Sequence, residues 1–159
     1  MIQDSGQRTE FETGAVRDIQ EGKGRCDLMP LDVVRKLLKS SEIQLIEVFR
    51  MTGNVEHLYT CLNVYAEHFM YTPSVMLLDV AIHFEEGAKK YGENNWQKGI
   101  PLHCYINSAI RHYLKHDAGI RDEHHDRAFV WNIMCAIWTY ENKPELDDFT
   151  VKEKENAGN

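Results

Sequence analysis

Apolar residues recur at steps of three and four along most of the chain, the period of an amphipathic helix. The pattern starts after Pro30 and predicts six helical segments. The clearest runs from residue 73 to residue 91, after the N-cap pair Thr72-Pro73 and before Gly92. No convincing strand and no internal repeat is visible, so the pattern predicts an all-α fold.

The last segment, roughly Asp122 to Tyr140, is apolar almost all round from Phe129 onward. A helix of that kind belongs at the centre of a bundle. Its apolar run is too short to span a bilayer, and Asn132 interrupts it. A buried amide needs hydrogen-bond partners, so we expect a ligand or a neighbouring backbone group beside Asn132.

The chain divides into three sections by composition. Residues 1–30 form an arm that is rich in glycine and charge, and such a long loop is usually disordered or functional. Residues 31–142 form the all-α domain, and residues 143–159 form a charged tail that we expect to be frayed.

Charge and cysteine content narrow the classes of partner. The 159-residue chain has a formal net charge of −7 and no Lys/Arg-rich run, so we expect no polynucleotide partner. A phosphorylated small molecule remains compatible, because a divalent cation can bridge carboxylates and phosphate. The four cysteines form no CxxC pair, and the first residues resemble no signal peptide. We therefore expect reduced thiols, a cytoplasmic location and no membrane association.

Acidic side chains in two segments are candidate metal ligands. In the segment 73–91, Glu86 points away from the apolar stripe and Glu85 lies at its margin, followed by Lys89 and Lys90. Taken alone, this helix favours a solvated face with a Glu85–Lys89 ion pair, because such pairs are common on surface helices.

Glu123 and Asp126 are three residues apart at the start of the last segment. On one helix face they could chelate one ion, although acidic residues are favoured in the first turn of any helix. His125 lies two helical turns before Asn132 on the same stripe, and this pair is more informative than either carboxylate. His112 and His116 have the i, i+4 spacing of metal-binding histidines, which by itself is a weak signal.

Two polar regions could bind a nucleotide. Arg17, Lys23 and Arg25 alternate with glycines in the arm, and such a segment can neutralise an anion. Trp96, beside Asn95 in a polar loop, is either a base-stacking platform or a lid over the core.

Three ordered blocks of the chain resemble phage dATP/dGTP diphosphohydrolases, which are similar to the wider MazG-like, all-α NTP pyrophosphohydrolases. The first block contains residues 11–18 (FETGAVRD), 21–25 (EGKGR), Asp27-Leu28 and Pro30. The second contains residues 83–92 (HFEEGAKKYG), 95–96 (NW) and 98–99 (KG). The third contains residues 111–112 (RH), 121–123 (RDE), His125 and 128–132 (AFVWN).

The resemblance implies a MazG-like helical bundle with the irregular arm, and residues 39–72 as an inserted helical pair. It also implies a Mg²⁺ or Mn²⁺ site built from a Glu-rich motif and an ExxD motif. Lys89 stands where the Glu-rich motif has its third acid, and in one register His125 takes the acidic position of the second motif. The implied metal ligands are Glu85, Glu86, Glu123, Asp126 and His125, with Glu85, Glu86 and Glu123 as catalytic candidates.

The implied reaction is hydrolysis of a purine dNTP to the monophosphate and pyrophosphate, in the nucleotide metabolism of a phage and inside its host cell. The implied substrate-binding residues are Arg17, Lys23, Arg25, Lys89, Lys90, Asn95, Trp96, Arg111, His112 and Asn132. The family also implies a homodimer or homotetramer. Two alternatives stay open: an HD-type phosphohydrolase using His116-Asp117 with His83 and Asp126, and a non-catalytic phage accessory protein that binds a host partner through residues 39–72.

Overall fold

The computed structural model describes residues 2–69 and 71–151 and is all-α apart from one short hairpin. Its elements, in chain order, are β1 (Arg8–Glu10), β2 (Val16–Asp18), η1 (Cys26–Leu28), α1 (Leu31–Leu38), α2 (Ser41–Thr52), α3 (Glu56–His68), α4 (Pro73–Tyr91), η2 (Asn95–Lys98), α5 (Leu102–Asp117), α6 (His125–Asn142) and η3 (Pro144–Leu146).

Local sequence signals account for the helix boundaries. α4 has the predicted bounds, because the side chain of Thr72 accepts a hydrogen bond from the backbone of Val75 and Gly92 adopts a positive φ at the other end. Ser40 caps α2 in the same way, accepting from the backbone of Ile43.

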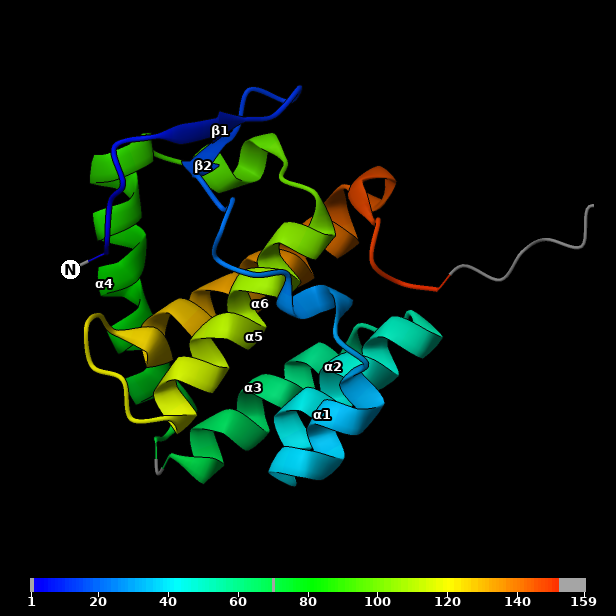
Figure 1. Ribbon diagram of the computed structural model, residues 1–159. Coiled ribbons are helices and arrows are strands. Elements are labelled where there is room, and N and C mark those ends of the chain that lie inside the picture. Colours follow the sequence, from blue (N-terminus) through cyan, green and yellow to red (C-terminus); the bar gives the residue numbers. More distant parts are fainter. Residues whose placement is uncertain (1, 70, 152–159) are drawn as a thin grey trace, which may run out of the picture.

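The long helices α5 and α6 pack against each other along the centre of the molecule (Figure 1). The paired helices α2 and α3 lie on one side, with α1 against α2, and α4 packs on α6 on the other side. Phe129 and Ile133 of α6 are fully buried, and the ring of Phe129 lies 4.4 Å from that of Tyr65 of α3. The predicted central position of the last helix is confirmed.

The arm contains a hairpin that the hydrophobic pattern did not predict. β1 and β2 pair antiparallel, whereas no strand was expected. Strands of three residues are too short to show an alternating pattern in the sequence. Contacts with the rest of the protein hold them in place. Ala15 is fully buried, and the side-chain amide of Asn95 both donates to and accepts from the backbone of Val16, at 2.8 and 2.9 Å.

Two other expectations were wrong. The last helix begins at His125 rather than near Asp122, so Glu123 lies in the preceding loop and does not share a helix face with Asp126. Residues 143–151 are not frayed: Phe149 is buried, and the backbone of Val151 donates to that of Arg50. The rest of the predicted tail, residues 152–159, lies outside the described residues.

All four cysteines are free thiols, as expected. Among the described residues, no helix combines the length and the apolar content that crossing a membrane requires.

Candidate active site

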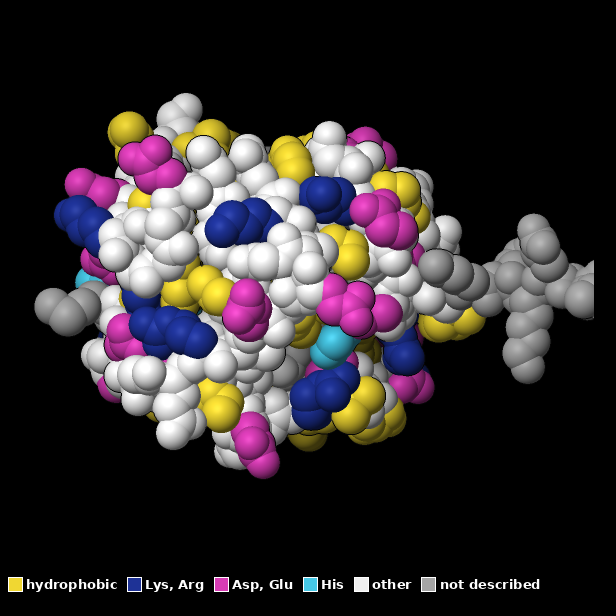
Figure 2. Space-filling model, turned by 90° about the horizontal axis from the view of Figure 1, so that it is seen from above, with side chains coloured by type: hydrophobic (Ala, Val, Ile, Leu, Met, Phe, Trp, Pro, Cys, Tyr) yellow, Lys and Arg dark blue, Asp and Glu magenta, His cyan; other side chains and the backbone are white. Residues whose placement is uncertain are grey.

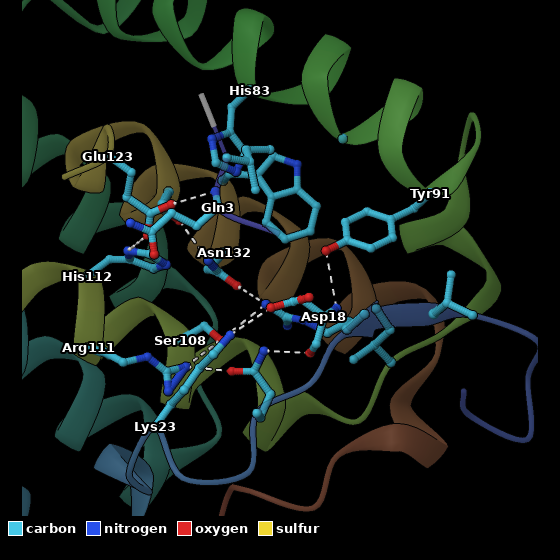
Figure 3. Close-up of a pocket in the computed structure, with 18 of the residues that line it drawn as sticks. Gln3, Asp18, Lys23, His83, Tyr91, Ser108, Arg111, His112, Glu123 and Asn132 are labelled. Carbon is cyan, nitrogen blue, oxygen red and sulfur yellow. Dashed lines mark hydrogen bonds and ion pairs between the residues drawn. The ribbon is translucent and has the colours of Figure 1, made fainter. Parts of the chain in front are cut away.

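A pocket of about 130 Å³ lies where the arm meets α4, α5 and α6. Figure 3 shows its side chains pointing inward from all four elements. On the face seen in Figure 2, Lys and Arg side chains are interspersed with Asp and Glu, so no single basic stripe covers this side. The pocket itself is different, because four cations line it: Arg17, Lys23, Arg111 and Lys115.

Arg17 reaches into the pocket from β2. Its Nη2 donates to Ser108 Oγ and to Asn132 Oδ1, both at 3.1 Å, and its guanidinium lies over the ring of Tyr105 at 5.2 Å. Its Nη1 is buried and has no hydrogen-bond partner within residues 2–69 and 71–151. A buried, unpaired charged donor is costly, so this group is suited to receive an anion.

Arg111 approaches the same point from α5. It donates to Ser108 Oγ at 3.2 Å and to Gln20 Oε1 at 2.6 Å. Burial lowers the pKa of its guanidinium, and the nearby charge of Arg17 acts in the same direction. Neither arginine has a carboxylate partner in the part of the chain that the structure describes, so the pair forms a positive centre that lacks a counter-charge.

Lys23, the third cation, is paired. Its Nζ donates to Asp18 Oδ2 at 2.8 Å, and Asp18 also accepts from Ser5. Burial alone would raise the pKa of Asp18, but the hydrogen bonds from Lys23 and Ser5 outweigh it and lower that pKa. The carboxylate of Asp18 therefore stays ionised and holds the arm together at the pocket wall.

Beside the cations, three side chains bring potential metal ligands together. His112 Nδ1 and His125 Nδ1 are 2.9 Å apart, and each lies 3.6 Å from Glu123 Oε1. His125 is buried, while Glu123 and His112 keep a small exposed fraction. The ligand atoms of these three side chains all lie within 4.8 Å of one another, which is close enough to share one metal ion.

Hydrogen bonds orient these groups. His125 Nε2 lies 2.5 Å from Asp122 Oδ1, which leaves the other ring nitrogen facing His112. Burial lowers the pKa of His112 well below its usual range, so its imidazole is neutral and able to act as a ligand. The backbone N–H of Gln3 donates to Glu123 Oε2 (Figure 3). The side chain of Gln3 donates to Asp122 Oδ2.

His83 and Trp131 form the less polar wall of the pocket. Their rings are 5.6 Å apart, and burial lowers the pKa of His83 to about 4, so this histidine is neutral. Trp131 Nε1 is buried, and no residue in the described part of the chain forms a hydrogen bond with it. Sequence reasoning overlooked Trp131 as a pocket residue because it lies in the apolar run of α6, where its neighbours are core residues.

The pocket gathers about half of the site residues expected from the sequence, from segments far apart in the chain. Those that line it are Arg17, Lys23, Asn95, Arg111, His112, Glu123 and Asn132. His125 lies directly behind His112. Gln20, Tyr91, Ser108 and Lys115 also line the pocket and were not singled out, because nothing in their local sequence separates them from ordinary helix or loop residues.

The expected substrate residues outside this group have other contacts. Arg25 forms a bidentate pair with Asp27. Lys90 donates to the backbone of Gln3. Trp96 packs edge-on against Trp138 at 5.0 Å and so acts as a lid over the core rather than as a wall of the pocket.

The expected acidic cluster does not form among the described residues. Glu85 is largely exposed and pairs with Lys89, as the surface alternative proposed. Asp126 accepts from the hydroxyl of Tyr71, away from Glu123. Glu86 is half-buried on α4, where its charge raises the pKa of His83 against the larger effect of burial. The acidic side chains are separated because Glu85 and Asp126 face away from the pocket, whereas Glu123 points into it from the loop before α6.

The residues of the HD-type alternative do not form a metal-binding group in the described part of the chain. His116 Nδ1 is bonded to the hydroxyl of Tyr65, its ring packs against Phe69 at 4.4 Å, and Asp117 is exposed.

Comparison with known proteins identifies one family. No curated protein and no solved structure matches the chain. A family model described as "dATP/dGTP diphosphohydrolase, N-terminal" matches residues 63–149, which is more than half of the chain and includes α4, α5, α6 and the loop that carries Glu123. The match begins within α3 and does not extend to the arm. The family name implies a hydrolase with a nucleotide substrate. The chain therefore belongs to the dATP/dGTP diphosphohydrolase N-terminal family.

Proposed function

We propose that the protein hydrolyses the purine deoxynucleoside triphosphates dATP and dGTP to the monophosphate and pyrophosphate, with a divalent cation as cofactor, in phage nucleotide metabolism. One observation carries this proposal: the guanidinium groups of buried Arg111 and half-buried Arg17, which have no carboxylate partner among the described residues, lie in the same pocket as three convergent side chains that can ligate a metal.

A triphosphate supplies the charge that this pocket lacks. Arg17 and Arg111 both contact Ser108, and their free donors can form charge-assisted hydrogen bonds to phosphate oxygens. Because the arginines are already fixed by Ser108, Asn132 and Gln20, little reorganisation is needed when negative charge develops on the pyrophosphate leaving group.

A cation held by His112, Glu123 and His125 would supply the remaining chemistry, polarising a phosphoryl oxygen and lowering the pKa of bound water. The ligand chemistry fits a divalent ion, since two imidazoles and a carboxylate converge. Mg²⁺ and Mn²⁺ are the ions that the family resemblance implies for this position.

The side chains that could contact the purine base are those whose polar groups are not already bonded within the protein. Asn132 is already committed, because it accepts from Arg17 and donates to the backbone of Ala128 at 2.8 Å. Its role in the proposal is therefore to position Arg17 rather than to read the base. Trp131 offers an aromatic face and an N–H that is unpaired among the described residues, and it therefore suits a purine better than Trp96 does.

Product analysis tests the reaction. With Mn²⁺ or Mg²⁺, dATP and dGTP are expected to give equimolar monophosphate and pyrophosphate by anion-exchange chromatography, and excess EDTA is expected to stop turnover. Tripolyphosphate or single phosphate as product would favour HD-type chemistry. Inertness toward every dNTP with both metals would favour the non-catalytic alternative.

We also propose a homodimer or homotetramer. Val75, Leu78 and Ile82 lie at steps of three and four on α4 and are 50%, 73% and 42% exposed, which forms an apolar stripe on the outer side of the helix. Light scattering at micromolar concentration is expected to give a mass of at least two chains.

Leu78→Asp is expected to shift that mass toward the monomer, because it buries a charge in the interface. Leu37→Asp on α1, at a position that is 80% exposed, is the matched control and is expected to leave the mass unchanged. A fully active monomer of the unmodified chain would refute this proposal.

A further inference from the structure

The spacing of His112, Glu123 and His125 has the dimensions of a metal-coordination sphere. Their three ligand atoms form a triangle with sides of 2.9, 3.6 and 3.6 Å. The centre of the circle through these corners lies about 2.0 Å from each of them, the bond length of Zn²⁺ or a similar ion to nitrogen and carboxylate oxygen. The triangle therefore accepts an ion without displacement of the side chains.

The protein also fixes the direction of its ligand atoms. Asp122 bonds His125 Nε2 at 2.5 Å, so that His125 Nδ1 points into the triangle. A carboxylate behind a ligating histidine is the usual partner that sets its tautomer and ring orientation. Gln3 restrains both acids, donating to Glu123 and Asp122. A bound cation would take the place of the hydrogen bond between the Nδ1 atoms of His112 and His125.

We propose that His112, Glu123 and His125 bind one divalent transition-metal ion, of the class Mn²⁺, Fe²⁺, Co²⁺ and Zn²⁺, in preference to Mg²⁺, with Asp122 as the positioning residue for His125. Two of the three ligands are nitrogen atoms, and imidazole suits these ions, whereas Mg²⁺ favours carboxylate, carbonyl and water oxygens.

This inference rests on the proposed function and deepens it by naming the class of its cation and the residue that orients His125, and its test uses no nucleotide. A chain that binds the ion at these residues but hydrolyses no dNTP would contradict the proposed function alone. A chain that hydrolyses dNTPs with its ion bound elsewhere would contradict this inference alone.

The test is titration of the purified full-length chain with Co²⁺ alone, followed by its visible absorption spectrum and by metal analysis after dialysis. We expect one ion per chain, and we expect an equal concentration of Mg²⁺ not to displace it. His112→Gln and Glu123→Gln are expected to lose this binding and the spectrum.

Asp122→Asn is expected to weaken binding by about 10–100-fold. Its side chain is 42% exposed, so this variant tests the site even where a change at buried His125 prevents folding. His57→Gln on α3 is the matched histidine control and is expected to bind as the unmodified chain does. Unchanged stoichiometry, affinity and spectrum in folded His112→Gln and Asp122→Asn, or displacement of Co²⁺ by equimolar Mg²⁺, would overturn the proposal.

Discussion

Arg17→Ala is expected to lower kcat/KM for dGTP by at least about a hundredfold. The substitution removes the guanidinium group that we assign to phosphate, whose Nη1 has no hydrogen-bond partner among the residues that the structure describes. Two charge-assisted contacts of roughly 1.5–3 kcal/mol each correspond to that loss or more. Arg17→Lys is expected to be a poor rescue, because one ammonium cannot keep the bonds to Ser108 and Asn132 and also bind phosphate.

The matched control is Arg25→Ala in the same arm. Arg25 is half-exposed, pairs with Asp27 and does not line the pocket, so its loss is expected to change kcat/KM much less. The thermal midpoint of each variant, followed by circular dichroism, separates a binding effect from the loss of packing of Arg17 over Tyr105. Equal decreases for the two variants would show that the arm contributes only general charge.

Glu123→Gln is expected to abolish turnover, with a decrease of at least about a hundredfold at saturating metal. The change keeps the size of the side chain but removes the anionic ligand beside His112 and His125, so the cation loses both affinity and charge balance. Initial rates of pyrophosphate release, measured over a range of Mn²⁺ concentrations, give the effect.

The same substitution at Glu85 is the control. The side chain of Glu85 is 66% exposed and its ion pair with Lys89 is on the surface, so the variant is expected to keep nearly full activity. Glu86→Gln is the third member of the series, because Glu86 lies nearer the pocket, within range of His83. Loss of activity at Glu85 or Glu86 but not at Glu123 would place the metal site on α4, as the family resemblance implies.

The helices could be predicted from the sequence because their signals are local. The 3.6-residue period marks each apolar face, and caps such as Thr72 and Gly92 set the ends. The all-round apolar character of α6 also predicted its central position. The hairpin in the arm could not be predicted in this way, since its strands depend on contacts with Asn95, almost eighty residues later in the chain.

For the site, the order of residues along the chain shows which functional groups are available: arm cations, acids near residues 85 and 123, and the histidines at 112 and 125. Which of these groups come into contact depends on how the folded elements pack. Packing of the arm against α5 and α6 brings Arg17 to Ser108 and Asn132, more than ninety residues away, and the loop before α6 turns Glu123 toward His112. Periodicity determines the face of a helix on which a side chain lies. Which residue of a distant segment it contacts depends on how the helices and the arm pack together. That packing places Glu85 on the surface and Glu123 in the pocket.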